Sequence, residues 1–502
     1  MSLLKSSFII SLMTFLSRVL GLVRDVVIAR LFGTSLVADA FFIAFKIPNF
    51  LRRLFAEGAF SQAFVPILSH VKVENEEAEV QKVINVIGSK LLFALIVITL
   101  IVVILAPIVV FVFASGFYQT PKFDLTVELL RITFPYLLFI SLTAFSGAIL
   151  NTYNRFAVPA FTPVLLNVSM IICAIYLSPK LTQPIVALAW GVFLGGVAQL
   201  LFQIPFLLKI RKLPRLTTKN HSQFAILKKR MLPALFGVGT AQLNLLIDMI
   251  LASYLVTGSI SWLYYANRLF EFPIALLGVA LATSSLPYLS KKFIKKDMDS
   301  FKKIINHNLK FTFVLGIPAI VGLIVLAQPL LITLFQYENF NAYDVKQASV
   351  ALIAYSAGLL GFILIKVLAN IFFASGDTKT PMKIGVVAIT VNIIMNFSLI
   401  GYYQHLGLAI ATSISAITNT GLLYFYLHKN NIFRVERELF ITIFKVIIAV
   451  IIMFLVIVFI NEPNKYWLSY NVFERVLLLT KIVISAIIVY FSVLFILRVP
   501  LR

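Results

Sequence analysis

The sequence predicts an all-α polytopic membrane protein with fourteen transmembrane helices. Apolar residues make up 60% of the 502 residues and charged residues only 13%, whereas soluble domains average about 25% charged residues. Apolar runs of about 20 residues, the length that spans a bilayer as a helix, recur along the whole chain. A weak internal repeat further predicts two six-helix lobes followed by a C-terminal helix pair.

The apolar runs and the polar connections between them define fourteen spans. Their predicted bounds are 8–32, 39–69, 85–113, 126–150, 160–177, 184–209, 231–255, 261–290, 308–336, 347–374, 383–401, 407–428, 438–460 and 474–497. Several spans exceed 20 residues and contain a proline, which predicts kinked or tilted helices. These prolines are Pro48, Pro66, Pro273, Pro287 and Pro318.

The repeat relates the first six spans to the next six. The segment DVVIARLFGTSLVADAFF, which begins at Asp25, aligns without gaps on DMILASYLVTGSISWLYY, which begins at Asp248, and Pro159 and Pro381 recur at nearly the same offset. Six spans per copy give both copies one orientation, so we expect a pseudo-two-fold axis along the membrane normal and a shared central cavity. The predicted domains are an N-terminal lobe (1–215), a C-terminal lobe (216–430) and a helix pair (431–502).

Loop charge predicts that both termini are cytoplasmic. Most Lys and Arg residues of the connections fall on the side of the N-terminus, as the positive-inside rule requires. The opposite side holds only Lys122, Lys180, Lys346 and Lys465. The formal net charge of +23 therefore reflects topology, and we expect no nucleic-acid partner. The chain has no GxxxxGK[ST] motif, so we expect a transporter without its own nucleotide hydrolysis, not an enzyme.

An unusual number of charges lies in the first two spans. The stretch 17–62 contains Arg18, Arg24, Asp25, Arg30, Asp39, Lys46, Arg52, Arg53 and Glu57. A charge at the bilayer centre costs about 2.5–3.5 kcal/mol on insertion scales, so such residues normally face a protein interior or a wet cavity. On ideal helices Arg18, Arg24 and Asp25 share a polar stripe about 120° wide. A second stripe, about 80° wide, holds Asp39, Lys46, Asn49, Arg53 and Glu57.

These charges allow two interpretations. Ion pairs such as Arg18 with Asp25, or Arg53 with Glu57, would pin helices together, and Arg30 would reach the outer interface. However, six cations against three acids leave a positive surplus in this stretch, and Arg268 in the eighth span adds to it. Guanidinium groups bind phosphate oxygens in a bidentate manner. The surplus therefore predicts a large, phosphate-bearing substrate.

Three further polar residues lie inside predicted spans. Asp248 lies in the seventh span, and Asn392 and Asn396 lie one turn apart in the eleventh. Together they could supply oxygen ligands for a sodium ion, the one monovalent ion we consider; interhelical hydrogen bonds are the alternative. We expect no other cofactor.

Five segments resemble one protein family. SRVLGLVRD, DAFFIAFKIPNFLRRLFAEGAFSQAFVPIL, ILNTYNRFAVPAFTP, SWLYYANRLFEFP and GVALATSSLPYLSK are similar to the MurJ (MviN) family of lipid II flippases. This family belongs to the multidrug/oligosaccharidyl-lipid/polysaccharide exporter superfamily. The resemblance runs over essentially the whole chain.

The resemblance implies a site and a substrate. The family's cavity arginines match Arg18, Arg24, Arg52 and Arg268. Its other important polar positions match Asp25, Asp39, Lys46, Asn49, Glu57, Ser261 and Glu271. Arg18, Arg24, Arg52, Arg268, Lys46, Asn49 and Ser261 are expected to bind substrate, and Asp25, Asp39, Arg53, Glu57 and Glu271 to gate or form ion pairs. Ideal phasing points to Arg53 as the inward residue and the resemblance to Arg52; we favour Arg52, because the kink at Pro48 makes phasing unreliable.

The implied activity is the movement of undecaprenyl-pyrophosphate disaccharide-pentapeptide (lipid II) to the outer leaflet of the bacterial cytoplasmic membrane for peptidoglycan synthesis. We expect alternating access driven by the membrane potential, with the helix pair forming a groove for the lipid tail. Expected partners are lipid II, membrane lipids and the cell-wall synthesis machinery. The alternatives are a flippase for another lipid-linked oligosaccharide, a cation or drug antiporter of the same superfamily, and a scaffold of cell-wall assembly.

Overall fold

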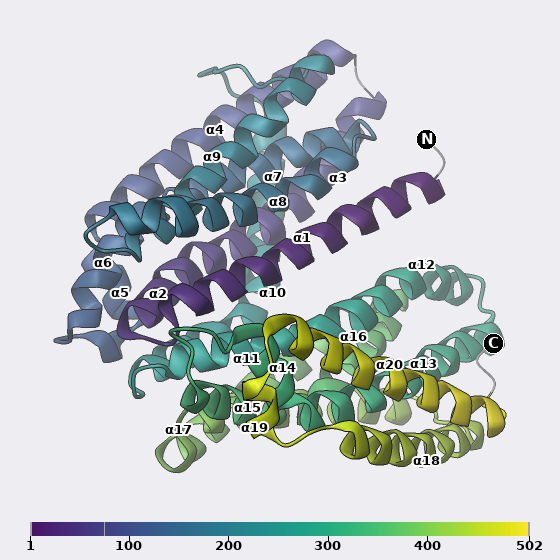
Figure 1. The fold of residues 1–502 in the computed structure, drawn as a ribbon. Helices are drawn as coiled ribbons and strands as arrows, with labels where there is room; N and C mark the ends of the chain where they lie inside the picture. The colour runs from purple at the N-terminus through teal and green to yellow at the C-terminus, as the bar shows by residue number, and fades with distance from the viewer. Residues whose placement is uncertain (1–2, 75, 500–502) are drawn as a thin grey trace. The chain divides into compact units, whose positions relative to one another are not determined.

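The computed structural model describes residues 3–74 and 76–499, without the side chains of 3–11, 56–59, 61–62, 232–241 and 279. The described residues are helical with no strand (Figure 1), which confirms the predicted all-α class. The chain forms two compact units, residues 1–261 and 262–502. Each unit is described by itself.

The first unit contains ten α-helices and four short π or 3₁₀ segments among its described residues. They are α1 (Leu3–Phe32), α2 (Leu36–Leu51), η1 (Arg52–Phe60), α3 (Ser61–Glu74), α4 (Glu77–Ile104), α5 (Ala106–Phe113), η2 (Ser115–Phe117), α6 (Pro121–Thr133), α7 (Tyr136–Thr152), α8 (Ala157–Ile172), η3 (Cys173–Leu177), η4 (Ser178–Lys180), α9 (Val186–Lys209) and α10 (Ser222–Ser253).

The helix α11 (Ser259–Pro273) begins at the end of the first unit and continues into the second. The second unit then contains η5 (Ile274–Val279), α12 (Ala280–Ile294), α13 (Met298–Val325), α14 (Ala327–Phe335), α15 (Ala342–Ala357), α16 (Leu359–Ala374), α17 (Lys379–Lys429), α18 (Arg437–Ile460), α19 (Asn464–Ser469) and α20 (Val472–Ile496).

Ten helices of the described residues are long and apolar enough to cross a membrane. Several predicted spans are interrupted rather than continuous. The span 85–113 is divided between α4 and α5 at Leu105, two residues before Pro107, and the span 126–150 is divided between α6 and α7 beside Pro135. Proline lacks the N–H that continues a helix and disfavours the helical conformation of the preceding residue.

The second-unit helix α17 consists of two helices that are separated by a break at Gln404. Gln404 has a non-helical backbone (φ 49°, ψ −129°) between two helical halves. A Cβ on Gly407 would lie 2.8 Å from the carbonyl oxygen of Leu399, so the chain reverses tightly at a position where only glycine fits. The break lies between the predicted spans 383–401 and 407–428.

The order of elements recurs along the chain. The π-helical segments η1 and η5 begin at Arg52 and Ile274, 222 residues apart, and the interruptions at Leu105 and Leu326 are 221 apart. The left-handed residues Asn154 and Gly376 are also 222 apart. Three unrelated local features therefore recur at the offset seen in the sequence.

The C-terminal helices α18 and α20 pack against each other, and α18 also packs along α13. The Tyr490 hydroxyl on α20 donates to the backbone oxygen of Val314 on α13. The buried Arg475 guanidinium donates to the backbone oxygens of Tyr470 and Gln336. These bonds fasten the pair to α13 and to the end of α14.

Close helix packing at Gly358 gives a test of the fold. A Cβ at this position would lie 2.6–2.8 Å from the side chain and Cα of Ser413. We expect Gly358→Ala to lower the free energy of unfolding by about 1–3 kcal/mol, because overpacking forces the helices apart. Gly421→Ala is the control, since open space surrounds Gly421, and it should stabilise α17 by about 0.5–1 kcal/mol. Thermal unfolding of the purified protein in detergent measures both; equal effects would contradict the packing.

Candidate functional site

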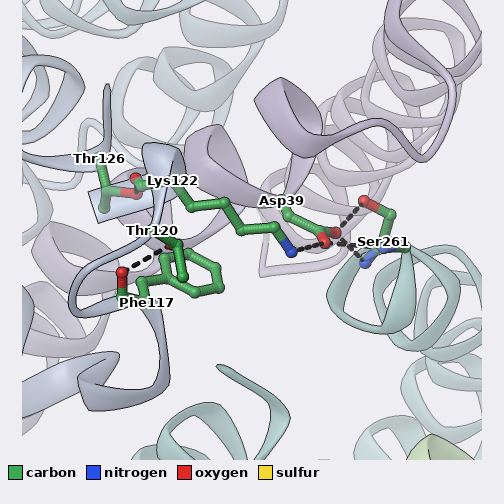
Figure 2. Close-up of polar contacts among 7 residues, drawn as sticks. Asp39, Phe117, Thr120, Lys122, Thr126 and Ser261 are labelled. Carbon is green, nitrogen blue, oxygen red and sulfur yellow. Dashed lines mark hydrogen bonds and ion pairs between the residues drawn. The ribbon is translucent and has the colours of Figure 1, made fainter. Parts of the chain in front are cut away.

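The carboxylate of Asp39 is the centre of the best-connected polar cluster in the first unit (Figure 2). Asp39 lies in the first turn of α2 and is 1% exposed. Its Oδ2 accepts hydrogen bonds from Lys122 Nζ at 3.1 Å and from the backbone N–H of Gly258 at 2.8 Å. Its Oδ1 accepts from the hydroxyl of Ser261 at 2.7 Å and from the Ser261 N–H at 3.1 Å. One carboxylate thus joins α2, the start of α6 and the turn between α10 and α11. We call this set of four residues the Asp39 latch.

The cation of the latch is itself buried. Lys122 is 7% exposed and follows Pro121, the first residue of α6. Its ammonium lies 5.0 Å from the ring centroid of Phe117, at a distance where a cation–π attraction adds to the ion pair. Because both charges are out of water, losing either partner would leave an uncompensated buried charge.

The turn that binds Asp39 has a backbone suited to the contact. Gly258 has φ 99°, in a region that side-chain-bearing residues rarely adopt. This conformation turns the chain between α10 and α11 so that two N–H groups, of Gly258 and Ser261, point at the same carboxylate. Ser261 is fully buried.

The residue after Ser261 makes an analogous contact in the second unit. The Trp262 indole N–H donates to Asp344 Oδ1 at 2.9 Å, and its ring lies 4.9 Å from the His405 ring. In the ungapped alignment of the repeat, Trp262 is the counterpart of Asp39. Asp344 follows Lys122 by 222 residues. The two contacts thus join residues at nearly the same sequence offset and have different chemistry.

Arg24 lies in a second buried polar cluster. Its Nε and Nη2 donate to Asp25 Oδ1 at 3.0 and 2.7 Å, and its Nη1 donates to Asn167 Oδ1 at 3.0 Å. The Asn167 amide in turn donates to the backbone oxygen of Ser17. The cluster joins α1 to α8, and the guanidinium carbon lies 5.7 Å from the Phe45 ring on α2. Arg24 is thus in an ion pair in this state, with Asp25 at 0% exposure.

The remaining charges of α1 to η1 are more accessible. Arg18 and Arg53 are exposed, whereas Lys46, Asn49 and Arg52 are half-buried. The Arg52 Nε donates to Asn49 Oδ1 at 3.2 Å, and the Asn49 amide donates to the backbone oxygen of Phe45. The side chain of Glu57 lies outside the described residues. Of the two predicted pairings, Arg18 with Asp25 is replaced by the adjacent pair Arg24–Asp25.

In the second unit, the predicted residues lie along α11. Arg268 and Glu271 are half-buried, and the Asn267 amide donates to Glu271 Oε1 at 3.1 Å. The Asn267–Glu271 bond spans one helical turn, so it organises this face of α11 locally.

The predicted sodium ligands are divided between the units. Asp248 is half-buried on α10 of the first unit. Asn392 and Asn396 are fully buried on α17 of the second, where Asn396 Nδ2 donates to Asn392 Oδ1 at 3.0 Å. No group of three His, Cys, Asp or Glu side chains suited to a metal occurs among the described residues.

Sequence reasoning missed three of these residues. Lys122 was assigned to an outer connection, yet it is buried as the partner of Asp39. A lysine on the side with few cations, directly after Pro121, was the available signal. Gly258 and Asn167 contribute a backbone N–H and an amide oxygen, and neither group has a sequence signature.

The fold is that of a polytopic membrane protein, because ten helices of the described residues are long and apolar enough to cross a membrane. Solved structures agree: an inward-facing multidrug resistance MATE family transporter of the MOP superfamily matches with TM-score 0.66 and 15% identity, over 83% of this chain and 95% of that chain. At this identity the match shows the fold alone.

The family is shown by closer matches. The family model for lipid II flippase MurJ matches residues 28–478, so the chain belongs to the lipid II flippase MurJ family. A probable lipid II flippase MurJ of Vibrio cholerae is 46% identical over 100% of this chain and 97% of its own length. A lipid II flippase MurJ solved in an inward closed conformation matches with TM-score 0.83 and 30% identity, over 98% of both chains.

The Asp39 latch gives a test by double-mutant cycle. We expect Asp39→Asn to lower the free energy of unfolding by about 3–5 kcal/mol, because Lys122 is left buried without its carboxylate. Lys122→Met should be similarly costly. The double variant should lose clearly less than the sum, since no lone charge remains. Thermal unfolding in detergent measures the three variants, and strictly additive losses would contradict the buried pair.

Proposed function

We propose that this protein is a lipid II flippase that moves the lipid-linked peptidoglycan precursor from the inner to the outer leaflet of the bacterial cytoplasmic membrane. The observation that carries this proposal is the family match over nearly the whole chain. The positive surplus of the first two spans supports it independently, because a pyrophosphate headgroup is the kind of anion that a cationic membrane cavity needs.

We infer fourteen spans in two six-helix lobes (1–215 and 216–430) with a C-terminal pair (431–502). The recurrence of π-helical segments and interruptions at an offset of about 222 residues supports the repeat. The break at Gln404 supports two membrane spans within α17. The distribution of loop cations supports cytoplasmic termini.

The proposed substrate ligands are of two kinds. Some are accessible in this structure, and others are bonded in a buried cluster that would have to open before they could bind substrate. Arg18 is exposed, and Arg52 lies beside Asn49. We propose these, together with Arg24, Lys46, Ser261 and Arg268, as headgroup contacts. Asp25, Asp39, Arg53, Glu57 and Glu271 would balance this charge or gate the cavity. The Ser261 hydroxyl is bonded to Asp39 in this state, so it would become available only when the latch opens.

The Asp39 latch suggests how the outer side is closed. Asp39 lies on α2 of the proposed N-terminal lobe, and Gly258 and Ser261 lie in the proposed C-terminal lobe. These bonds would break when the headgroup is released outside and form again after release. A developing substrate contact at Ser261 would compete directly with the latch.

The driving force can be the membrane potential. Moving one charge through the potential is worth about 2.3 kcal/mol per 100 mV, so a pyrophosphate with two charges gains about 4.6 kcal/mol per 100 mV on leaving a negative interior. Nucleotide hydrolysis is therefore not required. A coupled sodium ion at Asp248, Asn392 and Asn396 would add to the free energy that the membrane potential supplies.

Arg18 and Arg24 give a matched pair of variants. Arg18→Gln removes an exposed cation, so the protein should fold as wild type and lose lipid II transport. Arg24→Gln leaves Asp25 buried beside a neutral amide, so it should also lower the free energy of unfolding by about 3 kcal/mol or more. Complementation of cells depleted of their own flippase, with membrane abundance and thermal unfolding measured in parallel, separates the two effects. A transport-competent Arg18→Gln protein would contradict the proposed site.

The role of the potential is tested in intact cells. Dissipating the membrane potential with a potassium ionophore should stall the appearance of lipid II in the outer leaflet while its synthesis inside continues. Exposure of lipid II to an external modifying enzyme measures this. Undiminished export without a potential would mean that another gradient drives the cycle.

A further inference from the structure

The connection between α9 and α10 is fastened along α4 rather than free. We call residues 211–221 the strap. Three side chains of α4 bond its backbone: Gln81 Nε2 donates to the Leu213 oxygen at 3.0 Å, and Asn85 Oδ1 and Ser89 Oγ accept from the N–H groups of Arg215 and Thr217 at 2.8 and 2.9 Å. Gln81, Asn85 and Ser89 are four residues apart and thus lie on one face of the helix.

Both ends of the strap return to the start of α4. Lys212 forms an ion pair with Glu77 and donates to its backbone oxygen. At the other end, His221 Nε2 lies 2.8 Å from Glu79 Oε1, and His221 Nδ1 accepts from the N–H of Gln223 to cap α10. The strap therefore runs along α4 as far as Ser89 and comes back, and Leu216 is at its tip. Figure 1 shows the connection between α9 and α10 beside α4.

The tip lies beside the start of a predicted membrane span. Ser89 is about 18 Å along the helix axis from Glu77, at about 1.5 Å per residue. Ser89 also lies inside the predicted span 85–113, whereas Glu77 lies before it. Leu216, next to the Ser89 contacts, is 80% exposed, so the tip of the strap carries an exposed apolar side chain.

Three exposed cations lie along the strap, and one of them, Arg215, directly precedes Leu216. Arg211, Arg215 and Lys219 are exposed, and none of them forms an ion pair with a described residue. Lys212, in contrast, is 6% exposed and paired. The strap thus has one cation, Lys212, that holds it to α4 and three cations that are exposed.

We propose that the strap is a docking surface for anionic phospholipid headgroups of the cytoplasmic leaflet. An apolar side chain at the interface with cations around it is the arrangement that binds acidic lipid surfaces. Ordinary positive-inside charge needs no fixed backbone, whereas this surface is preorganised by Gln81, Asn85 and Ser89. The proposal rests on the sidedness given under Proposed function, but not on lipid II transport.

The test is lipid selectivity of the full-length protein in phosphatidylcholine bilayers. Electron spin resonance with trace spin-labelled phosphatidylglycerol or phosphatidylcholine measures which lipid is held at the protein surface. Wild type should prefer phosphatidylglycerol, and high salt should weaken the preference. Arg211→Gln/Arg215→Gln/Lys219→Gln should reduce the preference by about fivefold for each lost headgroup contact.

Two further variants make the test specific. Lys295→Gln/Lys302→Gln/Lys303→Gln removes equal charge from exposed positions of the α12–α13 region and should leave most of the preference. Asn85→Ala/Ser89→Ala keeps every charge but unfastens the strap, and should reduce the preference.

The proposal is overturned if the strap triple variant keeps the wild-type preference, if the control triple variant loses it equally, or if unfastening has no effect. Because no lipid II is present, none of these outcomes depends on whether the protein is a flippase.

Discussion

The buried ion pair between Asp39 and Lys122 is the interaction on which the first unit depends. Two charges at 1% and 7% exposure are tolerated in a membrane protein only when each is paired and hydrogen-bonded. Asp39 meets that condition by collecting Lys122, Gly258 and Ser261. This requirement brings α2, α6 and the α10–α11 turn to one point, although the three lie far apart in the sequence. The same requirement makes the contact suited to the proposed gating. A partly formed contact would leave a buried charge without its partner, so the contact is stable only when it is complete.

Electrostatic balance divides the remaining charges into two groups. Arg24 is neutralised by Asp25 and oriented by Asn167, so its charge is positioned before any substrate arrives. Arg18 is exposed and lies on the same helix, six residues earlier. In the proposed site, one fixed and one accessible guanidinium would keep their arrangement when empty and would still attract a multiply charged anion. Substrate would then bind to guanidinium groups that are already in position.

Composition and periodicity were sufficient to predict the helical class and the long apolar helices, because these depend on local sequence. The partners of Asp39 were not predictable, since the contact with Ser261 joins residues 222 positions apart. Ideal helical phasing is not valid at Arg52 and Arg53, so the prediction that Arg52 faces the cavity does not depend on it. The π-helical segment η1 begins at Arg52, and its wider turn departs from the 100° step on which the phasing relied. Arg52 is the half-buried residue of the two and bonds Asn49, whereas Arg53 is exposed.

The account is tested most directly by lipid translocation in vesicles that contain only the purified protein. Lipid II and a sugar-free polyprenyl pyrophosphate would be incorporated in parallel, with the wild-type protein and the Arg18→Gln variant, under an imposed potential. The account predicts that wild type moves lipid II across the bilayer, that Arg18→Gln does not, and that the sugar-free lipid moves more slowly. Lipid II that stays in its original leaflet in the presence of folded wild-type protein and a potential would contradict it.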